Sequence, residues 1–200
     1  MRVKSSWHGG RGKRAGRSHK KKSLGDIAGA LAFIVWKISR NGVENLINEK
    51  FDVISHEQLF GIISEYLIFL IQSSDRLVYK SLSQEQRGEF IQKLALKLAD
   101  HLQENQVDRM GEGDYRSPFI HQLNAEIHDY SEFSFSEDGP GYPFMCYFAE
   151  QAGKTLSEDD RKWFVAQVVE IEGPEAIEML RKGVTNLFGF GFIEECQGGD

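Results

Sequence analysis

The sequence contains little cysteine and no closely spaced cysteine pair. Its two cysteines, Cys146 and Cys196, stand far apart in a chain of 200 residues, and no Cys-x-x-Cys motif occurs. Zinc ribbons and thioredoxin-type redox sites are therefore excluded, because both require closely spaced cysteines. Two unclustered cysteines are typical of a reducing compartment, in which disulfides do not persist, so we expect a cytoplasmic protein.

Long hydrophobic runs are also missing. The two longest apolar stretches, residues 27–36 and 66–71, fall short of the roughly 20 residues that a membrane-spanning helix needs. The first stretch follows a basic segment, as the core of a secretory signal does, but no small-residue cleavage site follows Trp36. We therefore expect neither a membrane span nor a secretory signal.

Signatures of common enzyme classes are lacking too. The chain has no Gly-x-Ser-x-Gly motif and no glycine-rich phosphate loop after a strand. Residues 134–143 form an acidic loop segment, but they lack the ligand spacing of a calcium loop. These absences favour a non-enzymatic interaction or regulatory protein over an enzyme. We expect its partner to be another protein or a second copy of the chain.

Acidic residues are absent from positions 1–22, although the whole chain has a net charge of −6. This segment holds nine of the 24 Lys and Arg residues, which leaves 15 basic and 30 acidic residues in positions 23–200. The segment is rich in glycine and poor in apolar groups, so it cannot bury enough surface to become ordered alone. The sequence therefore predicts a disordered basic tail attached to an acidic body.

A basic tail of this kind has three interpretations. Its cations can bind a nucleic acid, since each phosphate contact releases a counterion. It can also lie on an anionic membrane surface beside the apolar segment 24–38, although the sequence favours this less. The third interpretation, which we prefer, is a solubilising extension or a segment upstream of the true start. The candidate nucleic-acid contacts are Arg11, Lys13, Arg14, Arg17, Lys20, Lys21 and Lys22.

From Ser23 onward the apolar residues have a helical period, and no alternating apolar run predicts a strand. Serines precede several of these segments and serve as N-caps, while Asn41-Gly42 is typical of a helix end. The sequence therefore predicts an all-α fold, with a single-domain bundle of six or seven helices over residues 23–190 and a flexible end at 191–200. The predicted helices are residues 23–39, 56–79, 83–104, 118–133, 144–153, 157–171 and 173–187, with a short additional helical segment at 43–49.

One predicted helix, residues 56–79, has an unusually wide apolar face. Its apolar side chains cover an arc of about 200°, which is wider than the stripe of a surface helix. A helix with such a face is buried on more than one side, so we expect residues 56–79 to form the centre of the bundle. The polar residues Glu65 and Asp75 fall in the remaining sector.

Polar side chains within apolar stripes are the candidates for chemistry. Glu126 lies in the stripe of residues 118–133, and His101 and Arg87 lie in that of residues 84–104. A buried carboxylate needs a partner, because removing it from water costs several kcal/mol. Inward-facing carboxylates and an imidazole on different helices are the ligands of helical-bundle metal sites. The candidate metal ligands are Glu65, Asp75, His101 and Glu126.

The alternative for these residues is structural. Arg87 and Glu126 would then form a buried ion pair, and His101 would be a hydrogen-bonded core residue. The Glu-x-x-His motif of ferritin-like diiron sites occurs nowhere in the chain. We therefore expect no cofactor, with a metal-binding protein or enzyme as the alternative. On the structural interpretation, Glu126→Ala costs about 3–5 kcal/mol because it leaves a buried charge unpaired.

Overall fold

The computed structural model describes residues 23–51 and 53–189, and all of the regular structure within these ranges is helical. No strand occurs there, so the predicted all-α bundle is confirmed. A 3-10 turn (Gly153–Thr155) follows the fifth helix. A single turn of π-helix (Val168–Glu172), called the π-turn below, joins the last two helices. The α-helices are α1 (Leu24–Asn48), α2 (His56–Val78), α3 (Gln84–Met110), α4 (Arg116–Ser131), α5 (Tyr142–Ala152), α6 (Glu158–Gln167) and α7 (Gly173–Phe188).

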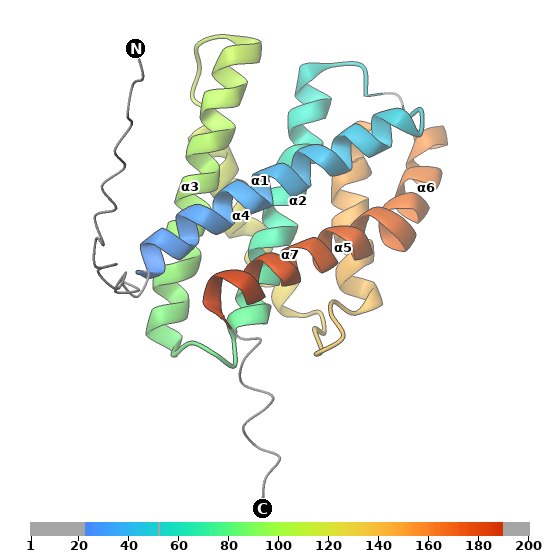
Figure 1. The fold of residues 1–200 in the computed structure, drawn as a ribbon. Helices are drawn as coiled ribbons and strands as arrows, with labels where there is room; N and C mark the ends of the chain where they lie inside the picture. Colours follow the sequence, from blue (N-terminus) through green and yellow to red (C-terminus); the bar gives the residue numbers. More distant parts are fainter. Residues whose placement is uncertain (1–22, 52, 190–200) are drawn as a thin grey trace, which may run out of the picture.

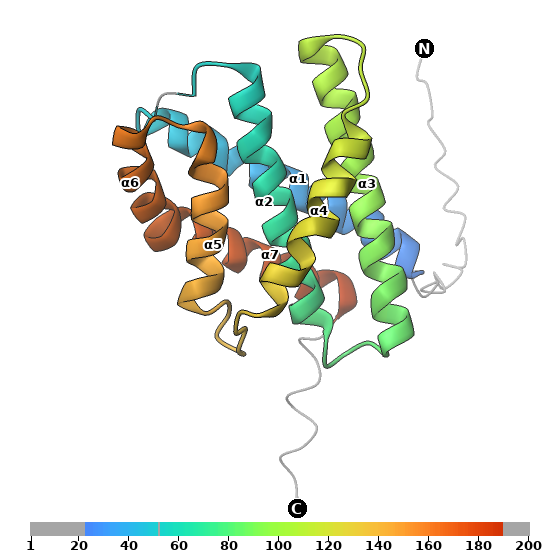
Figure 2. The ribbon, with the colours of Figure 1, turned by 180° about the vertical axis from the view of Figure 1, so that it is seen from behind.

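The helices form a bundle in which two of them cross the others. α1 and α7 lie side by side and run across α2, α3 and α5 (Figure 1). From behind, α4 covers part of α2 and α3, and α5 lies on the other side of α2 (Figure 2). No helix in the described ranges combines the length and apolar character needed to cross a membrane.

The helix α2 is the centre of the bundle, as its wide apolar face predicts. It contacts α1, α3, α4, α5 and α7, and 15 of its 23 residues are buried. Phe69 stacks on Phe148 of α5 with a centroid distance of 4.2 Å, and Tyr66 meets the same ring edge-on at 4.8 Å. Glu65, which the sequence placed in a polar sector, is buried as well, and so is Gln72. Packing therefore covers α2 on nearly every side.

The first helix does not end at Asn41-Gly42, as the sequence predicted. α1 continues without a break to Asn48, so the two helices expected over residues 23–39 and 43–49 are one. Gly42 lies inside the helix, opposite Tyr66 of α2. A Cβ atom at position 42 would be only 2.6 Å from Cζ of the tyrosine ring. The glycine therefore allows a close approach between α1 and α2 and does not terminate a helix.

This contact predicts that Gly42→Ala destabilises the protein. The Tyr66 ring is fully buried, so it can make room for a methyl group only by disturbing its neighbours, at a cost of about 1–3 kcal/mol. Gly29→Ala is the matched control, because position 29 is on the same helix and no atom of the described residues lies within 4 Å of its Cβ site. That change should stabilise the helix by about 0.5–1 kcal/mol. Urea unfolding of both variants tests the difference, and equal effects would contradict it.

The other predicted helices differ from the structure mainly at their ends. α3 extends to Met110, six residues beyond its predicted end, and stops at Gly111, whose φ is 93°. α4 begins at Arg116 and not at the predicted Pro118, because the side chain of Asp114 accepts a hydrogen bond from the amide of Ser117 at 3.0 Å. The predicted tail at 1–22 and the end at 191–200 lie outside the described residues.

Candidate functional site

Three side chains on one side of α4 face the central helix α2. Gln122, Glu126 and Tyr130 are spaced four residues apart, which aligns them along the helix. Glu65 of α2 lies next to both Gln122 and Glu126. The structure therefore brings together Glu65 and Glu126, two of the four residues that the sequence suggested as metal ligands. We call these two residues the glutamate pair.

A single side-chain amide connects the glutamate pair. Nε2 of Gln122 donates to Oε1 of Glu65 at 2.6 Å and to Oε1 of Glu126 at 3.0 Å. Glu65 is 7% exposed and Glu126 is 8% exposed. Both Oε2 atoms and the hydroxyl of Tyr130 are buried without a hydrogen-bond partner among the described residues. Buried polar atoms rarely remain without a partner, so this cluster can accept one more group.

Burial raises the pKa of both carboxyl groups, because it removes the water that stabilises their charged forms. Burial and then the negative charge of Glu126 raise the pKa of Glu65 to about 8. The pKa of Glu126 is also raised, chiefly by burial. Lys154 opposes both shifts by attraction, but its ammonium group binds Gln151 and forms no ion pair with either carboxylate in the described structure. The pair therefore needs a proton or a cation to neutralise it.

Two tyrosines border the glutamate pair. Burial, followed by the charges of Glu65 and Glu126, raises the pKa of Tyr130 well above its ordinary value. The hydroxyl of Tyr147 on α5 donates to Oδ2 of Asp129 at 2.7 Å, and burial and this bond raise the pKa of Tyr147. Both phenols are therefore neutral at physiological pH.

Asp75, a third suggested ligand, forms separate ion pairs near the C-terminal end of α2. Its Oδ1 is 3.2 Å from Nε of Arg87 on α3, and its Oδ2 is 3.6 Å from Nη1 of Arg76. Arg76 also donates to the backbone oxygen of Tyr130 at 3.3 Å, which ties α2 to α4. The ion pair suggested between Arg87 and Glu126 is therefore wrong. Arg87 is taken by Asp75, and Glu126 receives the amide of a glutamine on its own helix.

His101, the fourth suggested ligand, contacts α1 and is not part of the glutamate pair. Its ring is half-buried, with its centroid 6.1 Å from that of Trp36. Within residues 23–51 and 53–189, no group of three or more His, Cys, Asp or Glu side chains is placed to hold a metal ion. The four suggested ligands therefore do not form one site. The suggested nucleic-acid contacts between Arg11 and Lys22 lie outside the described residues.

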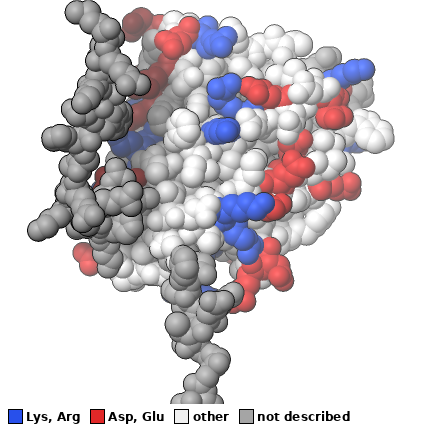
Figure 3. All heavy atoms as spheres, in the orientation of Figure 1, with Lys and Arg blue, Asp and Glu red and all other residues white. Residues whose placement is uncertain are grey.

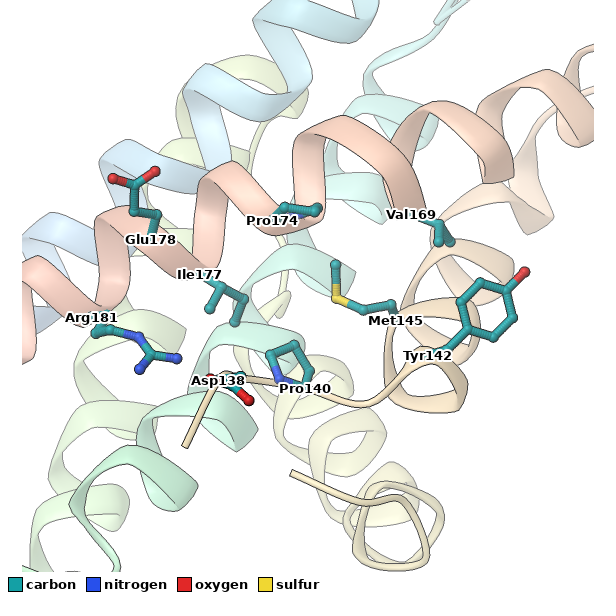
Figure 4. A pocket seen from close by; sticks show the side chains of 9 residues that line it. All are labelled: Asp138, Pro140, Tyr142, Met145, Val169, Pro174, Ile177, Glu178 and Arg181. Carbon is teal, nitrogen blue, oxygen red and sulfur yellow. The ribbon is translucent and has the colours of Figure 1, made fainter. Parts of the chain in front are cut away.

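A second candidate site is an open hollow of about 480 Å³ between α5, α7 and the loop before α5. Pro140, Met145 and Ile177 point towards one another across it from these three elements (Figure 4). Tyr142 lies at one end, with 73% of its surface exposed, and Arg181 lies at the other. We call this site the α5–α7 hollow. Its remaining lining residues are Asp138, Val169, Pro174 and Glu178.

The hollow is held open by contacts at the start of α7 and in the loop. Met145 packs against the backbone of Gly173, where a Cβ atom would lie 2.2 Å from its Cε. Arg181 donates to the backbone oxygen of Glu137 at 2.5 Å, which fastens the loop to α7. These contacts fix two walls of the hollow relative to each other. The site is therefore built by packing within the domain and does not need a ligand to form.

The π-turn before α7 contributes another wall and carries a buried carboxylate. Glu172 is 4% exposed and accepts hydrogen bonds from Asn45 of α1 at 3.2 Å and from Gln167 at 3.5 Å. Burial raises the pKa of Glu172 above its ordinary value. Val169 of the same turn faces the hollow. π-Helical segments are rare and occur frequently at functional sites, which favours this region as a functional site.

Charged side chains lie around the apolar lining of the hollow. On the face seen in Figure 3, Asp and Glu side chains gather along α7, with Lys and Arg side chains between them. Glu178 is paired with Lys182 at 2.5 Å, and Arg181 is bound to the loop. Asp138 supplies a further carboxylate at the rim. The rim therefore carries two acidic side chains, one of which is paired with Lys182, and one arginine that is hydrogen-bonded to the loop.

Sequence reasoning found neither Gln122 nor Tyr130 nor the hollow. The spacing of Gln122, Glu126 and Tyr130 by four residues was the available signal for the first two. For the hollow, the signals were the Gly-Pro pairs at positions 139–140 and 173–174, which open a loop and a helix.

Known proteins give no independent indication of function. Comparisons of the chain with protein-family models, with curated proteins and with solved structures found no match. The geometry of the glutamate pair and of the α5–α7 hollow is therefore the evidence on what the protein does.

Proposed function

We propose that the protein is a non-enzymatic interaction protein that binds a segment of a partner protein in the α5–α7 hollow. The observation that carries this proposal is the open apolar hollow beside the exposed Tyr142. Its volume, about 480 Å³, is within the range of roughly 300–1,000 Å³ typical of ligand pockets. Tyrosine and methionine are enriched in protein interfaces, and both line this hollow.

The lining favours binding over catalysis. Its side chains are mainly apolar, and the titratable ones are Asp138, Tyr142, Glu178 and Arg181. Glu178 and Arg181 are engaged in the pairs described above. No histidine or cysteine of residues 23–51 and 53–189 lines the hollow to act as a base or nucleophile. The apolar floor suits the burial of one large side chain, for which the hydrophobic effect supplies the free energy.

The charge around the hollow favours a partner segment that carries basic residues. Residues 23–200 hold 30 acidic and 15 basic side chains, so the body as a whole attracts cations. At the rim itself Asp138 adds negative charge, whereas Glu178 is paired with Lys182 and Arg181 adds a positive charge, so the acidic body carries this preference. The proposed ligand is therefore an apolar anchor side chain with Lys or Arg close to it in the partner's sequence.

A peptide-display selection against the full chain tests this proposal. We expect enriched peptides to contain a large apolar residue next to basic residues. Tyr142→Ala should weaken their binding about tenfold or more, because truncation of an interface aromatic residue commonly costs over 1.4 kcal/mol. Tyr79→Ala is the matched control, since Tyr79 is 62% exposed and does not line the hollow. Binding that is equally strong in both variants, or no enrichment at all, would refute the proposal.

A further inference from the structure

We infer that the glutamate pair, together with Gln122 and Tyr130, is a binding site for a hard divalent cation such as Mg²⁺, Mn²⁺ or Ca²⁺. This site is formed by α2 and α4, shares no lining residue with the α5–α7 hollow, and does not depend on the proposed function. Its donors come from two helices of the bundle. They are therefore held by the fold and not by a loop.

The first argument is the number of buried oxygen atoms without a partner. Oε2 of Glu65, Oε2 of Glu126 and the hydroxyl of Tyr130 are all buried and unpaired among the described residues. Tyr130 has none of its surface exposed, and its hydroxyl lies close enough to feel the charges of both glutamates. An additional partner common to the three oxygens would satisfy all of them.

The second argument is the charge of the pair. The two carboxyl groups lie next to each other, joined through a single amide nitrogen, and no Lys or Arg of the described residues forms an ion pair with them. Two carboxylates cannot both stay ionised at such a site without a counter-charge. A divalent cation neutralises both at once, whereas a single shared proton neutralises only one.

The donor chemistry selects a hard cation. Carboxylate, amide and hydroxyl oxygens are the ligands of Mg²⁺, Mn²⁺ and Ca²⁺, while zinc sites favour His and Cys ligands. Rotation of the Gln122 amide by half a turn exchanges its nitrogen for its oxygen, which then becomes a further oxygen donor between the carboxylates. Small size matters as well, because Glu65, Glu126 and Tyr130 are all buried. The remaining coordination positions would be filled by water.

Thermal melting of the full chain, stripped of metal by a chelator and dialysed, tests this inference at pH 7.5. MgCl₂, MnCl₂ and CaCl₂ are the probes. We expect at least one of them to raise the melting temperature by roughly 5 °C or more when it is present far above its dissociation constant. Terbium is a second probe, because its emission is sensitised by a nearby tyrosine. Tyr130→Phe should reduce that emission.

Conservative variants show whether the ion binds at this pair. Glu65→Gln and Glu126→Gln should lose the rise in melting temperature, while Glu104→Gln, an exposed change on α3, should keep it. The amide variants keep the size of the side chain, so they fold without a cavity. If no ion shifts the wild-type melting temperature, or if all variants respond equally, the pair holds a shared proton and the inference is wrong.

Discussion

Glu65→Gln should stabilise the protein by about 3–5 kcal/mol at pH 8 in metal-free buffer, because it removes a buried carboxylate that cannot ionise without cost. The wild-type carboxyl group is next to Glu126, and among the described residues only the Gln122 amide donates a hydrogen bond to it. A neutral glutamine at this position has no charge to desolvate. This effect would be large relative to the total stability of a typical domain.

The pH dependence follows from the pKa of about 8 for Glu65, compared with 4.5 for a free side chain. Below pH 4.5 the group is protonated in both the folded and the unfolded chain, so it favours neither. Between pH 4.5 and 8 the unfolded chain loses this proton while the folded chain keeps it. Stability therefore falls by about 1.4 kcal/mol per pH unit as the pH rises through this range.

Other charged groups that face the pair modify this effect. Lys154 lowers the pKa of both glutamates by attraction, whereas Asp129 raises that of Glu126. Tyr130 and Tyr147 stay neutral over the same range, since burial raises their pKa values. Wild type and variant share these neighbours, so the difference between them reports the titration of Glu65 together with its interaction with Glu126.

Urea unfolding at several pH values between 5 and 8 measures the effect. The free energies of wild type and Glu65→Gln should be similar near pH 5 and should separate as the pH increases. Glu104→Gln, on the exposed side of α3, is the control and should follow the wild type at each pH. A constant difference between wild type and Glu65→Gln across this range would show that the carboxyl group titrates normally.

The sequence predicted the helices well because their starts depend on local chemistry. Ser23, Ser55 and Ser83 each accept a hydrogen bond from the backbone amide three residues later, and each has a reciprocal side chain at that position. Such capping boxes need no tertiary contact. Gly42 is different, because a glycine can either end a helix or allow a neighbouring helix to approach closely. The two roles are distinguished by whether Tyr66 lies opposite position 42, and the sequence alone does not show this contact.

The candidate site was predicted only in part, for a related reason. A helical wheel indicated that Glu126 is buried, and this is confirmed. The wheel gives the direction of a side chain on its own helix but not which helix lies opposite. Arg87 was therefore paired with Glu126, whereas α3 presents it to Asp75. Because no Lys or Arg of the described residues pairs with Glu126, Glu126→Ala in metal-free buffer should not cost the 3–5 kcal/mol expected for a broken buried ion pair.

The α5–α7 hollow could not be predicted from periodicity, because part of its lining comes from segments without an α-helical period. The loop before α5 has no repeating pattern, and the π-helical residues 168–172 depart from the α-helical period. Among the contacts that hold them in place, Met145 packs directly on the backbone of Gly173. A change at this contact should therefore affect both the stability of the fold and the shape of the hollow.

Gly173→Ala should therefore destabilise the protein by about 3 kcal/mol, at the upper end of the usual cost of overpacking. The new Cβ atom would lie 2.2 Å from Cε of Met145 and 2.9 Å from the backbone oxygen of Val168. Met145 can rotate away, but it would then leave its place in the lining. The oxygen of Val168 can move only if the π-turn rearranges.

Urea unfolding and binding of selected peptides measure the two consequences of Gly173→Ala. Gly29→Ala is the control for the substitution itself, because its Cβ site is open and it should be slightly stabilising. If the hollow is the binding site, Gly173→Ala should also weaken peptide binding at temperatures where the variant is still folded. Unchanged stability would show that the turn adapts to a methyl group. Lower stability with unchanged binding would show that Gly173 supports the fold but not peptide binding. The displaced Met145 would then not contribute to the contact with the partner.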